Sequence, residues 1–569
     1  MAGLNSIFNT ASSSIVAQRV AMEVTGENVA NVNTPGYSRQ RAIMETAPVT
    51  NSSGFPLGNG VLVKSVQRFY DAVLQKNITD GNSTLQNNQS RLKSLQAIEP
   101  SFNDVTTDGL GKSIQDFFDS WQALSVNAAG TPERQAVLAR AQIMIDNFHQ
   151  VNQTLRDVQT NSNRTLDGIT AEITLKARNI ASLNEQIKQT ELVGASASEL
   201  RDQRDYLAQE LAKKVGASFT EEKNGAVTVT LPDGSTLVDG NQYATVYTNP
   251  LSISPSDPND VNPSNHILIT AIGNPPPVNK PITDYDISAT IGGPRNSRGE
   301  IGAMISLRDT VIPGYLQKLD ELAYNLANQV NVQHKLGWSL NNAVGTDFFN
   351  FASAPATIKN IDTTGPPALT AGMTVSGMGI PAGTIIASVD STTRITLTPP
   401  LIHSIVSGTT FTISGVITRT GDATGISGYS SSDSSRGISL NLVSTNEIAA
   451  ADTSPLTGGS GNNSNALALA AVKDMQVPFT TGGGASASVT SYFNAIVSGI
   501  GVDVQTFQNA SDQGESYVAQ LNNLRESNSG VSLDEEMTNM IKYQKAFQGA
   551  AKMITTATDM MDIVLGMVR

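Results

Sequence analysis

The organisation of the chain is decided by residues 28–41, which read Asn-Val-Ala-Asn-Val-Asn-Thr-Pro-Gly-Tyr-Ser-Arg-Gln-Arg. Up to and into this stretch, apolar side chains recur at steps of three, four or seven residues: Leu4, Phe8, Ala11, Ile15, Met22, Val29 and Val32. Such spacing predicts a helix with one narrow apolar seam, as in helices that pair side by side. Pro35 lacks an amide donor and Gly36 tolerates a positive φ angle, so we expect the helix to end just before them.

A second heptad pattern occupies residues 531–569. One apolar series has a seven-residue repeat and a second series lies three residues after its middle members: Leu533, Met540, Phe547, Ile554 and Met561, then Tyr543, Ala550, Ala557 and Val564. Two seams at opposite ends of the chain predict that the two helices pair with each other, although packing of each helix on a core of its own remains an alternative. The predicted coiled-coil and assembly interface is Leu4, Phe8, Ile15, Met22, Val29, Met537, Met540, Phe547, Ile554, Met561 and Leu565.

These ends carry a resemblance to a known group of proteins. The pattern Asn28, Asn31, Thr34, Pro35, Gly36, Tyr37 and Arg39 resembles the N-terminal signature of bacterial flagellar rod, hook and hook-associated proteins. Residues 539–547, Asn-Met-Ile-Lys-Tyr-Gln-Lys-Ala-Phe, are similar to the C-terminal helix of the same proteins. The resemblance implies a tubular assembly in which paired terminal helices line an axial channel.

Two internal blocks narrow the resemblance to one family. Residues 200–207, Leu-Arg-Asp-Gln-Arg-Asp-Tyr-Leu, and the run from Arg298 to Phe349 resemble the hook–filament junction family, and residues 461–466 match it again. The resemblance implies a structural protein that joins the hook to the filament outside the cell and is exported through the flagellar type III channel. It implies as partners further copies of the chain in a ring or helical assembly, the hook protein, the next junction protein or flagellin, and a small export chaperone on the C-terminal helix. Other flagellar axial proteins, hook or distal rod, are the first alternative; a surface adhesin or hydrolase carried on β inserts is the second.

The hydrophobic periodicity predicts a multidomain α + β fold with long terminal helices, a helical bundle and inserted, mostly β outer domains. Helices are expected at 68–98, 114–126, 132–192, 198–215 and 299–337, and a Gly/Pro-rich connection at 48–60. Strand alternation appears at 227–231, 395–397 and 411–413. The expected domains are a terminal helical unit (1–50 plus 531–569), a helix-rich middle domain (51–215, 297–350 and 451–530), and two β-rich inserts (216–296 and 351–450).

Composition excludes several classes of function. The 569 residues carry a formal net charge of −13, which argues against a nucleic-acid partner. There is no cysteine, so neither a disulfide framework nor a cysteine-based zinc site is expected. No apolar run approaches the length that spans a bilayer, and no basic region followed by an apolar block marks a cleaved secretion signal. Only 15% of residues are charged, which is typical of broad polar surfaces that meet other protein.

No catalytic, cofactor or metal site is predicted. Residues 109–113, Gly-Leu-Gly-Lys-Ser, lack the earlier glycine and the preceding strand of a phosphate-binding loop. The oxygen-rich run at 257–260 lacks the central Gly and closing Glu of a calcium loop. The histidines are scattered: His149, His266, His334 and His403. For the Arg and Asp pairs within residues 200–207, an ion-pair cluster, either solvated or between helices, is favoured over acid–base catalysis.

Overall fold

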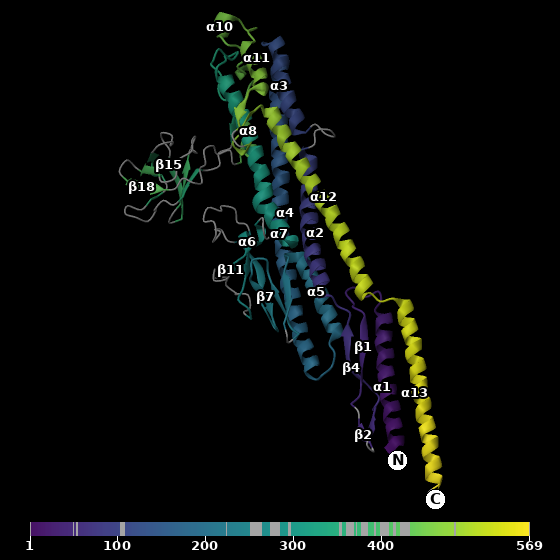
Figure 1. Ribbon diagram of the computed structural model, residues 1–569. Coiled ribbons are helices and arrows are strands. Elements are labelled where there is room, and N and C mark those ends of the chain that lie inside the picture. Colours follow the sequence, from purple (N-terminus) through teal and green to yellow (C-terminus); the bar gives the residue numbers. More distant parts are fainter. Residues whose placement is uncertain are drawn as a thin grey trace.

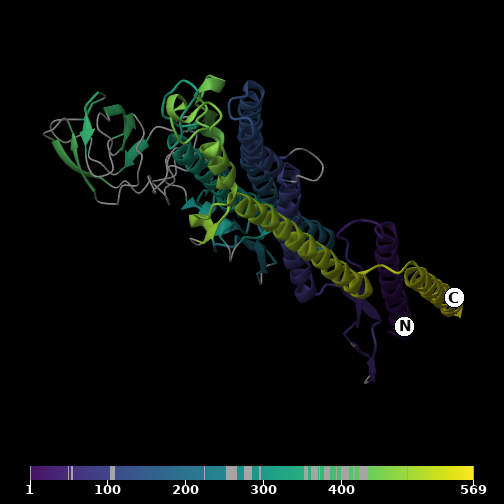
Figure 2. The same ribbon diagram turned by 90° about the horizontal axis from the view of Figure 1, so that it is seen from above.

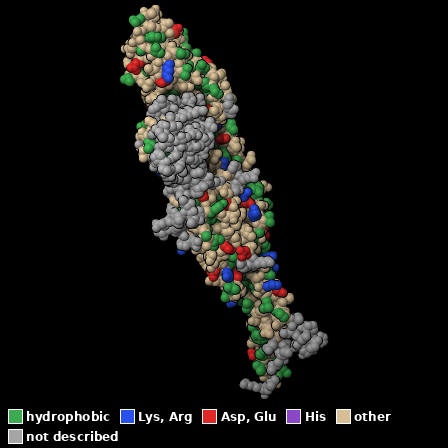
Figure 3. Space-filling model, turned by 90° about the vertical axis from the view of Figure 1, so that its left-hand side faces the viewer, with side chains coloured by type: hydrophobic (Ala, Val, Ile, Leu, Met, Phe, Trp, Pro, Cys, Tyr) green, Lys and Arg blue, Asp and Glu red, His purple; other side chains and the backbone are tan. Residues whose placement is uncertain are grey.

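The molecule is elongated, with the two ends of the chain together at one end and a helical body extending away from them (Figure 1). The computed structural model describes every residue except 1, 49, 53–54, 103–108, 223–224, 251–264, 274–284, 294–296, 352–355, 360–368, 371, 377–384, 392–393, 399–408, 414–416, 422–432, 483–484 and 568–569. A view from above shows the same separation of the chain ends from the body (Figure 2). The space-filling view shows the left-hand side of Figure 1, where charged side chains are spread thinly among polar and apolar ones (Figure 3).

The first part is a terminal unit, residues 2–70 and 531–567. Its helices α1 (Ala2–Ala30) and α13 (Leu533–Met567) lie side by side, and α1 also packs on a β-ribbon. The ribbon pairs β1 (Gln40–Thr46) with β4 (Val61–Arg68), and β2 (Thr50–Ser52) with β3 (Phe55–Leu57). The Gly/Pro-rich stretch predicted as a plain connection therefore contains an antiparallel strand pair, β2 with β3.

The second part is a helical body with a first hydrophobic core. Its helices are α2 (Ala72–Ile98), α3 (Leu110–Val126), the first half of α4 (Thr131–Leu192), α8 (Ile312–Lys335), α11 (Ser464–Ala471) and α12 (Val489–Ser529). Four aromatic side chains pack at its centre, with ring centroids 5.5 Å apart for Trp121 and Phe348 and 4.8 Å apart for Phe348 and Phe349; Phe117 touches both phenylalanines. Such pairs add to the free energy of simple burial.

A second core lies beside the other half of α4, where two small sheets meet α5 and α7. Its helices are α5 (Ser198–Val215), α6 (Ser288–Gly292) and α7 (Gly299–Ser306). One sheet has the order β5 (Ser218–Glu221), β6 (Val227–Thr230), β7 (Thr236–Asp239), β8 (Gln242–Tyr243); the other has the order β11 (Tyr285–Asp286), β10 (Asn265–Ile269), β9 (Val246–Pro250). A π-helical turn, Leu307–Val311, leads from α7 in this core to α8 in the first one.

The third part is an outer insert that leaves and re-enters the body through paired strands. These are β12 (Phe349–Phe351) and β19 (Ile438–Leu440), with Phe351 opposite Ile438. Its sheets have the orders β13 (Ala356–Lys359), β16 (Arg394–Thr398), β15 (Ile385–Ser391) and β14 (Val375–Ser376), β17 (Thr409–Ile413), β18 (Ile417–Gly421). The remaining short elements are α9 (Ser434–Gly437), α10 (Pro455–Gly458), β20 (Val477–Pro478), β21 (Ser486–Ala487) and four 3₁₀ turns, Glu99–Phe102, Thr445–Glu447, Val472–Asp474 and Thr480–Gly482.

The predicted fold class, a multidomain α + β chain with long terminal helices and β inserts, is confirmed. The helices expected at 132–192 and 198–215 are α4 and α5, and the expected 299–337 helix is α7 and α8 with the π turn between them. The 41-residue helix α12 was not anticipated. The exact domain boundaries stay a prediction. Helix α4 contributes to both cores and so helps to join them.

Candidate functional site: the signature segment and the terminal helix pair

The signature segment, residues 28–39, is held by one buried asparagine. Asn28 is 1% exposed, and its Oδ1 accepts hydrogen bonds from the Tyr37 hydroxyl and the Gln40 amide, each at 2.9 Å. Its Nδ2 donates to the Gln40 carbonyl at 2.9 Å and to Glu536 Oε2 at 3.1 Å. Every donor and acceptor of a buried side chain must find a partner, and here the partners lie on three elements. Asn28 therefore ties the end of α1 to the start of β1 and of α13.

An arginine completes this connection. Arg39 Nε lies 2.7 Å from Glu536 Oε1, and Arg39 Nη1 lies 2.7 Å from Glu535 Oε2. Glu536 is only 2% exposed, so this carboxylate depends on Arg39 and Asn28 for its stabilisation. Both glutamates lie in the first turn of α13, where the helix dipole also favours negative charge. The guanidinium of Arg525, near the end of α12, donates to the Tyr37 carbonyl at 3.0 Å.

The turn between Asn28 and Arg39 has an exposed tip and a packed side. Asn33, Thr34 and Pro35 are exposed, and the Thr34 hydroxyl donates to Asn31 Oδ1 at 3.1 Å. Gly36 has φ +85°, and a Cβ there would lie 3.0 Å from the Cβ of Tyr206, so glycine is required for both conformation and space. Residues 31–37 line an open hollow with residues 525–526 and 529–531 at the end of α12.

The predicted interface residues fall into two groups. Those that lie half-buried along the helix pair are Phe8, Ile15, Met22 and Val29 on α1 and Met540, Phe547, Ile554 and Met561 on α13. Met537 and Leu565 are 60% and 58% exposed, on the outer side of α13, and the side chain of Leu4 lies outside the described residues. The most buried positions are mostly small residues: Ala11, Ala17, Ala21, Val24, Thr25, Ala550 and Ala557. The apolar series of the sequence included Ala11, Ala550 and Ala557 but not the other four. A small-residue stripe at steps of three or four along α1 was the available signal.

A second polar cluster joins the terminal unit to α5. Arg68 Nη1, at the end of β4, lies 2.7 Å from Asp202 Oδ1 and 3.0 Å from Asp205 Oδ2. The other carboxylate oxygen of Asp202 accepts the Ser38 amide at 3.0 Å. Burial raises the pKa of Asp202, while Arg68 and the Ser38 amide act in the opposite direction. The carboxylates of the Leu200–Leu207 block thus bind the terminal unit. Ion pairing was expected of them, but their partner Arg68 lies on a β-strand and the pairs are largely buried, whereas a solvated cluster or one between helices was expected.

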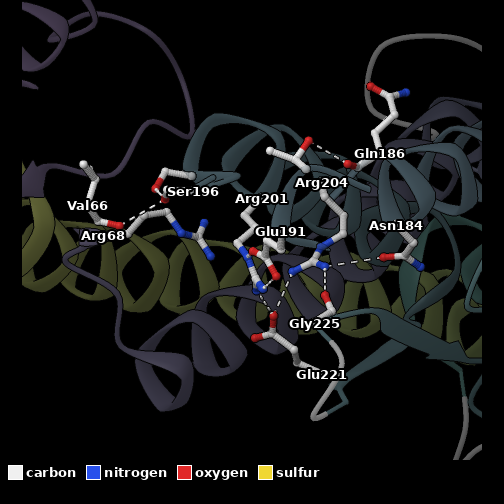
Figure 4. A network of polar contacts seen from close by, with 12 residues as sticks. Val66, Arg68, Asn184, Gln186, Glu191, Ser196, Arg201, Arg204, Glu221 and Gly225 are labelled. Atoms are coloured by element: carbon white, nitrogen blue, oxygen red, sulfur yellow. Dashed lines mark hydrogen bonds and ion pairs between the residues drawn. The ribbon is translucent and has the colours of Figure 1, made fainter. Parts of the chain in front are cut away.

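The arginines of the same block face the second core (Figure 4). Arg201 forms a bidentate pair with Glu191 at the end of α4, at 2.8 and 3.0 Å, and also binds Glu221 of β5. Arg204 is 1% exposed and donates to the Gly225 carbonyl at 2.7 Å and to Glu221 at 3.3 Å. Bidentate arginine–carboxylate pairs fix geometry as well as adding energy. Helix α5 is thus bound on two sides.

Comparisons with known proteins match the parts of the chain that carry these contacts. The family model for the flagellar hook-associated protein FlgK helical domain matches residues 95–349, and the models for the flagella basal body rod protein and the FlgEFG C-terminal region match residues 8–37 and 525–567. Flagellar hook-associated protein 1 of Escherichia coli K12 is 28% identical, covering 99% of this chain and 100% of the relative; that of Bacillus subtilis 168 is 25% identical, covering 98% and 97%. Over almost its whole length, this chain is similar to flagellar hook-associated protein 1.

A solved structure shares the fold of this chain. The flagellar hook junction protein FlgK from Burkholderia pseudomallei is 17% identical, with a TM-score of 0.57, and the match covers 79% of this chain and 100% of that one. The family models meet both ends of the chain and its helical middle, the same parts that carry the signature segment, the helix pair and α5.

The histidines and acids considered for chemistry have structural partners where the structure describes them. His334 is fully buried, with Nδ1 2.6 Å from the Thr346 carbonyl and Nε2 accepting the Ala449 amide at 2.9 Å. His266 pairs with Asp286 at 2.9 Å, and His149 Nε2 lies 3.0 Å from the Ile438 carbonyl. His403 and the 257–260 run lie outside the described residues. Among the described residues, no group of three acids or histidines is placed to hold a metal ion.

In the parts of the chain that the structure describes, none of the helices combines the length and apolar character needed to cross a bilayer.

Proposed function

We propose that this chain is a structural subunit of the bacterial flagellum that joins the hook to the filament. The proposal rests on sequence similarity: relatives named flagellar hook-associated protein 1 align over almost the whole chain. The observation in the molecule that carries it is the terminal unit, in which α1 and α13 pair but leave large apolar side chains uncovered. Uncovered apolar side chains in such numbers are typical of surfaces that meet other protein.

The uncovered side chains concentrate on α13. Those at least 40% exposed are Leu533, Met537, Ile541, Met553, Met560, Ile563, Val564, Leu565 and Met567. An open apolar hollow lies across the helix pair, with Ile7 on one side and Met553, Ala557 and Met560 on the other. Further copies of the chain, the hook protein, and the next junction protein or flagellin are the partners that would cover this surface in a tube.

The test is complementation of a bacterial strain that lacks its own hook-associated protein 1. Expression of this chain is expected to restore filaments on hooks, seen by negative-stain electron microscopy, and swimming. The matched variant Asn28→Ala removes four hydrogen bonds and should leave hooks bare, whereas Asn33→Ala, on the exposed tip, should restore filaments. Bare hooks with the unmodified chain, in a strain shown to secrete it, would reject the junction role.

The order of the terminal helices is expected to depend on assembly. Each helix has one seam and few charges, and an isolated helix gains little stability without tertiary burial. Limited proteolysis of the purified monomer should trim residues 1–40 and 531–569 to a stable core. Resistance of full-length monomer at both ends would reject this expectation.

Export through the flagellar type III channel, with a small chaperone on the C-terminal helix, is the accompanying proposal. The chaperone would cover Met537, Met540, Phe547, Ile554 and Met561, since methionine packs adaptably in a groove. Deletion of residues 531–569 should abolish co-purification with the chaperone. Unchanged co-purification would place the chaperone elsewhere on the chain.

A further inference from the structure

The joint between the terminal unit and the body is polar. The buried apolar side chains of both cores lie within residues 95–500, so neither core extends into the terminal unit. Among the described elements, β4 and α5 pack against each other across the joint, and this contact is a small one. The joint is therefore held by a few directed contacts, and apolar burial contributes little to it. Units joined through small polar interfaces are free to move unless specific contacts fix them.

Most of those contacts lie on α5 and the loop before it. The end of α12 adds the bond from Arg525 to the Tyr37 carbonyl and a bond from the Arg39 amide to the Ser529 carbonyl, each at 3.0 Å. Arg68 is only 8% exposed in its side chain and is shared by two carboxylates of α5, while Asp202 also holds the Ser38 amide. The Ser196 hydroxyl donates to the Val66 carbonyl at 3.0 Å, and Tyr206 packs against Gly36. The segment 196–206 thus contacts both the β-ribbon and the signature segment.

The same helix is fixed to the body by two arginines, Arg201 and Arg204. Arg201 and Arg204 lie one position before Asp202 and Asp205, so the two pairs point to neighbouring sides of α5. The arginine side holds Glu191 of α4 and Glu221 of β5, and Asn184 of α4 accepts from Arg204 at 3.4 Å. Asn184 also holds β6, because its Nδ2 donates to the Val227 carbonyl at 2.9 Å.

We propose that α5 is a latch that fixes the orientation of the terminal unit on the body. Its carboxylate side, Asp202 and Asp205, closes the latch on Arg68. Its arginine side anchors the latch to α4 and β5. When the carboxylate side is neutralised, the β1–β4 ribbon of the terminal unit reorients as one piece while both cores keep their structure. The Leu200–Leu207 block is then a positioning element of the isolated chain, independent of the proposed junction role.

The test is a distance measurement in the full-length monomer. The chain contains no cysteine, so introduced cysteines carry spin labels only at chosen positions. Leu62→Cys on β4, where the side chain is 51% exposed, and Lys188→Cys on α4, which is also exposed, span the joint and avoid the terminal helices. The parent protein should give one narrow distance distribution. The double variant Asp202→Asn with Asp205→Asn should give a distribution at least about twice as wide, as for a released joint.

Two controls keep the result specific. Arg201→Gln cuts the anchoring side of the same helix and should leave the Leu62–Lys188 distribution narrow, because Arg204 still holds Glu221 and Gly225. A label pair inside the body, Gln122→Cys with Lys188→Cys, should not change in any variant. An unchanged width in the double Asp variant, a broad distribution in the parent, or equal broadening by Arg201→Gln would each overturn the latch.

Discussion

The aromatic core of the body and the terminal helix pair bury different kinds of side chain. In the body, Phe117, Trp121, Phe348 and Phe349 are at most 1% exposed and contact one another directly. In the terminal pair, the apolar residues buried below 5% are alanines, and most large apolar side chains are half-buried or exposed. Because hydrophobic stabilisation grows with the apolar area removed from water, the body gains stability within one chain. Under the proposed function, the terminal pair would gain it from neighbouring chains.

The strongest way to test this contrast is to empty the body core. Phe348→Ala removes a fully buried ring that packs on Phe117, Trp121 and Phe349, and such changes cost about 3–5 kcal/mol. Urea unfolding of the monomer should show this loss. Phe351→Ala, at a half-buried ring stacked on Tyr324, should cost less than half as much. Equal losses would mean that the aromatic cluster is not the centre of the core.

Acid should also act on the body before the terminal pair. Burial lowers the pKa of His334 to about 4, and only the neutral ring can donate to Thr346 and accept from Ala449. An unfolded histidine takes up its proton near pH 6.5. The contribution of the neutral ring is therefore complete above that pH and is lost as the pH falls through the interval down to the folded-state value. At about 1.4 kcal/mol per pKa unit, the loss approaches about 3 kcal/mol.

The measurement is urea unfolding at pH 7 and pH 4.5. His334→Gln should be less stable than the parent at pH 7 but should show a smaller loss on acidification. His149→Gln is the matched control, since that ring contacts a single carbonyl, and it should keep the acid dependence of the parent. An unchanged acid dependence in His334→Gln would assign the acid sensitivity to other groups.

The sequence predicted what is periodic or punctuated and missed what depends on neighbours. Helix α5 has its predicted limits, 198–215, because an apolar period coincides with Gly216, which has φ +69°. The stop at Pro35 and Gly36 was read in the same way. The alanines of α1 carried no strong hydrophobic signal, and their burial follows from the close approach of α13 and the β-ribbon. Nor could the pattern of α4 reveal that its two halves enter different cores.

The candidate site also combines residues that the sequence identified with contacts that it could not predict. The signature residues were found by their resemblance to a family, but their partners were not, since Asn28 and Glu536 are 508 positions apart in sequence. The Arg and Asp pairs of α5 were identified as an ion-pair cluster, whereas the assignment of one pair to each side required the positions of Arg68 and Glu221.

Smaller effects on the monomer are expected from the terminal pair. Phe547 lies half-buried in the middle of α13, between Met540 and Ile554. Phe547→Ala should hardly change monomer melting, yet the void repeated around a ring should prevent a stable junction. The expected phenotype is a hook without a filament, with flagellin and this chain released to the medium. The exposed neighbouring change Lys545→Ala should cost no more than about 0.5 kcal/mol and leave filaments normal. Normal filaments from Phe547→Ala, or an equal defect from Lys545→Ala, would show that another face of α13 makes the contact.

The smallest effect is expected from removal of the outer insert. It was predicted as residues 351–450, but Ile438, Leu442, Ile448 and Ala450 belong to the first core. The re-entering stem is also held by the body, because Asp320 on α8 accepts hydrogen bonds from the amides of Asp433 and Ser435, each at 2.9 Å. The removable part is therefore residues 352–432.

The described residues on either side of that segment belong to one stem. Phe351 and Ile438 are opposite each other in the β12–β19 pair, so a short Gly/Ser linker can join 351 to 433 without distorting the body. Removal of 352–432 should leave monomer melting, filament assembly and swimming unchanged, because the signature segment, the helix pair and both cores remain. The matched deletion of 352–450 also removes core side chains and should unfold the body. Loss of swimming by the shorter deletion, with a folded and exported protein, would show that the insert takes part in the junction. The body and the terminal pair alone would then not account for assembly.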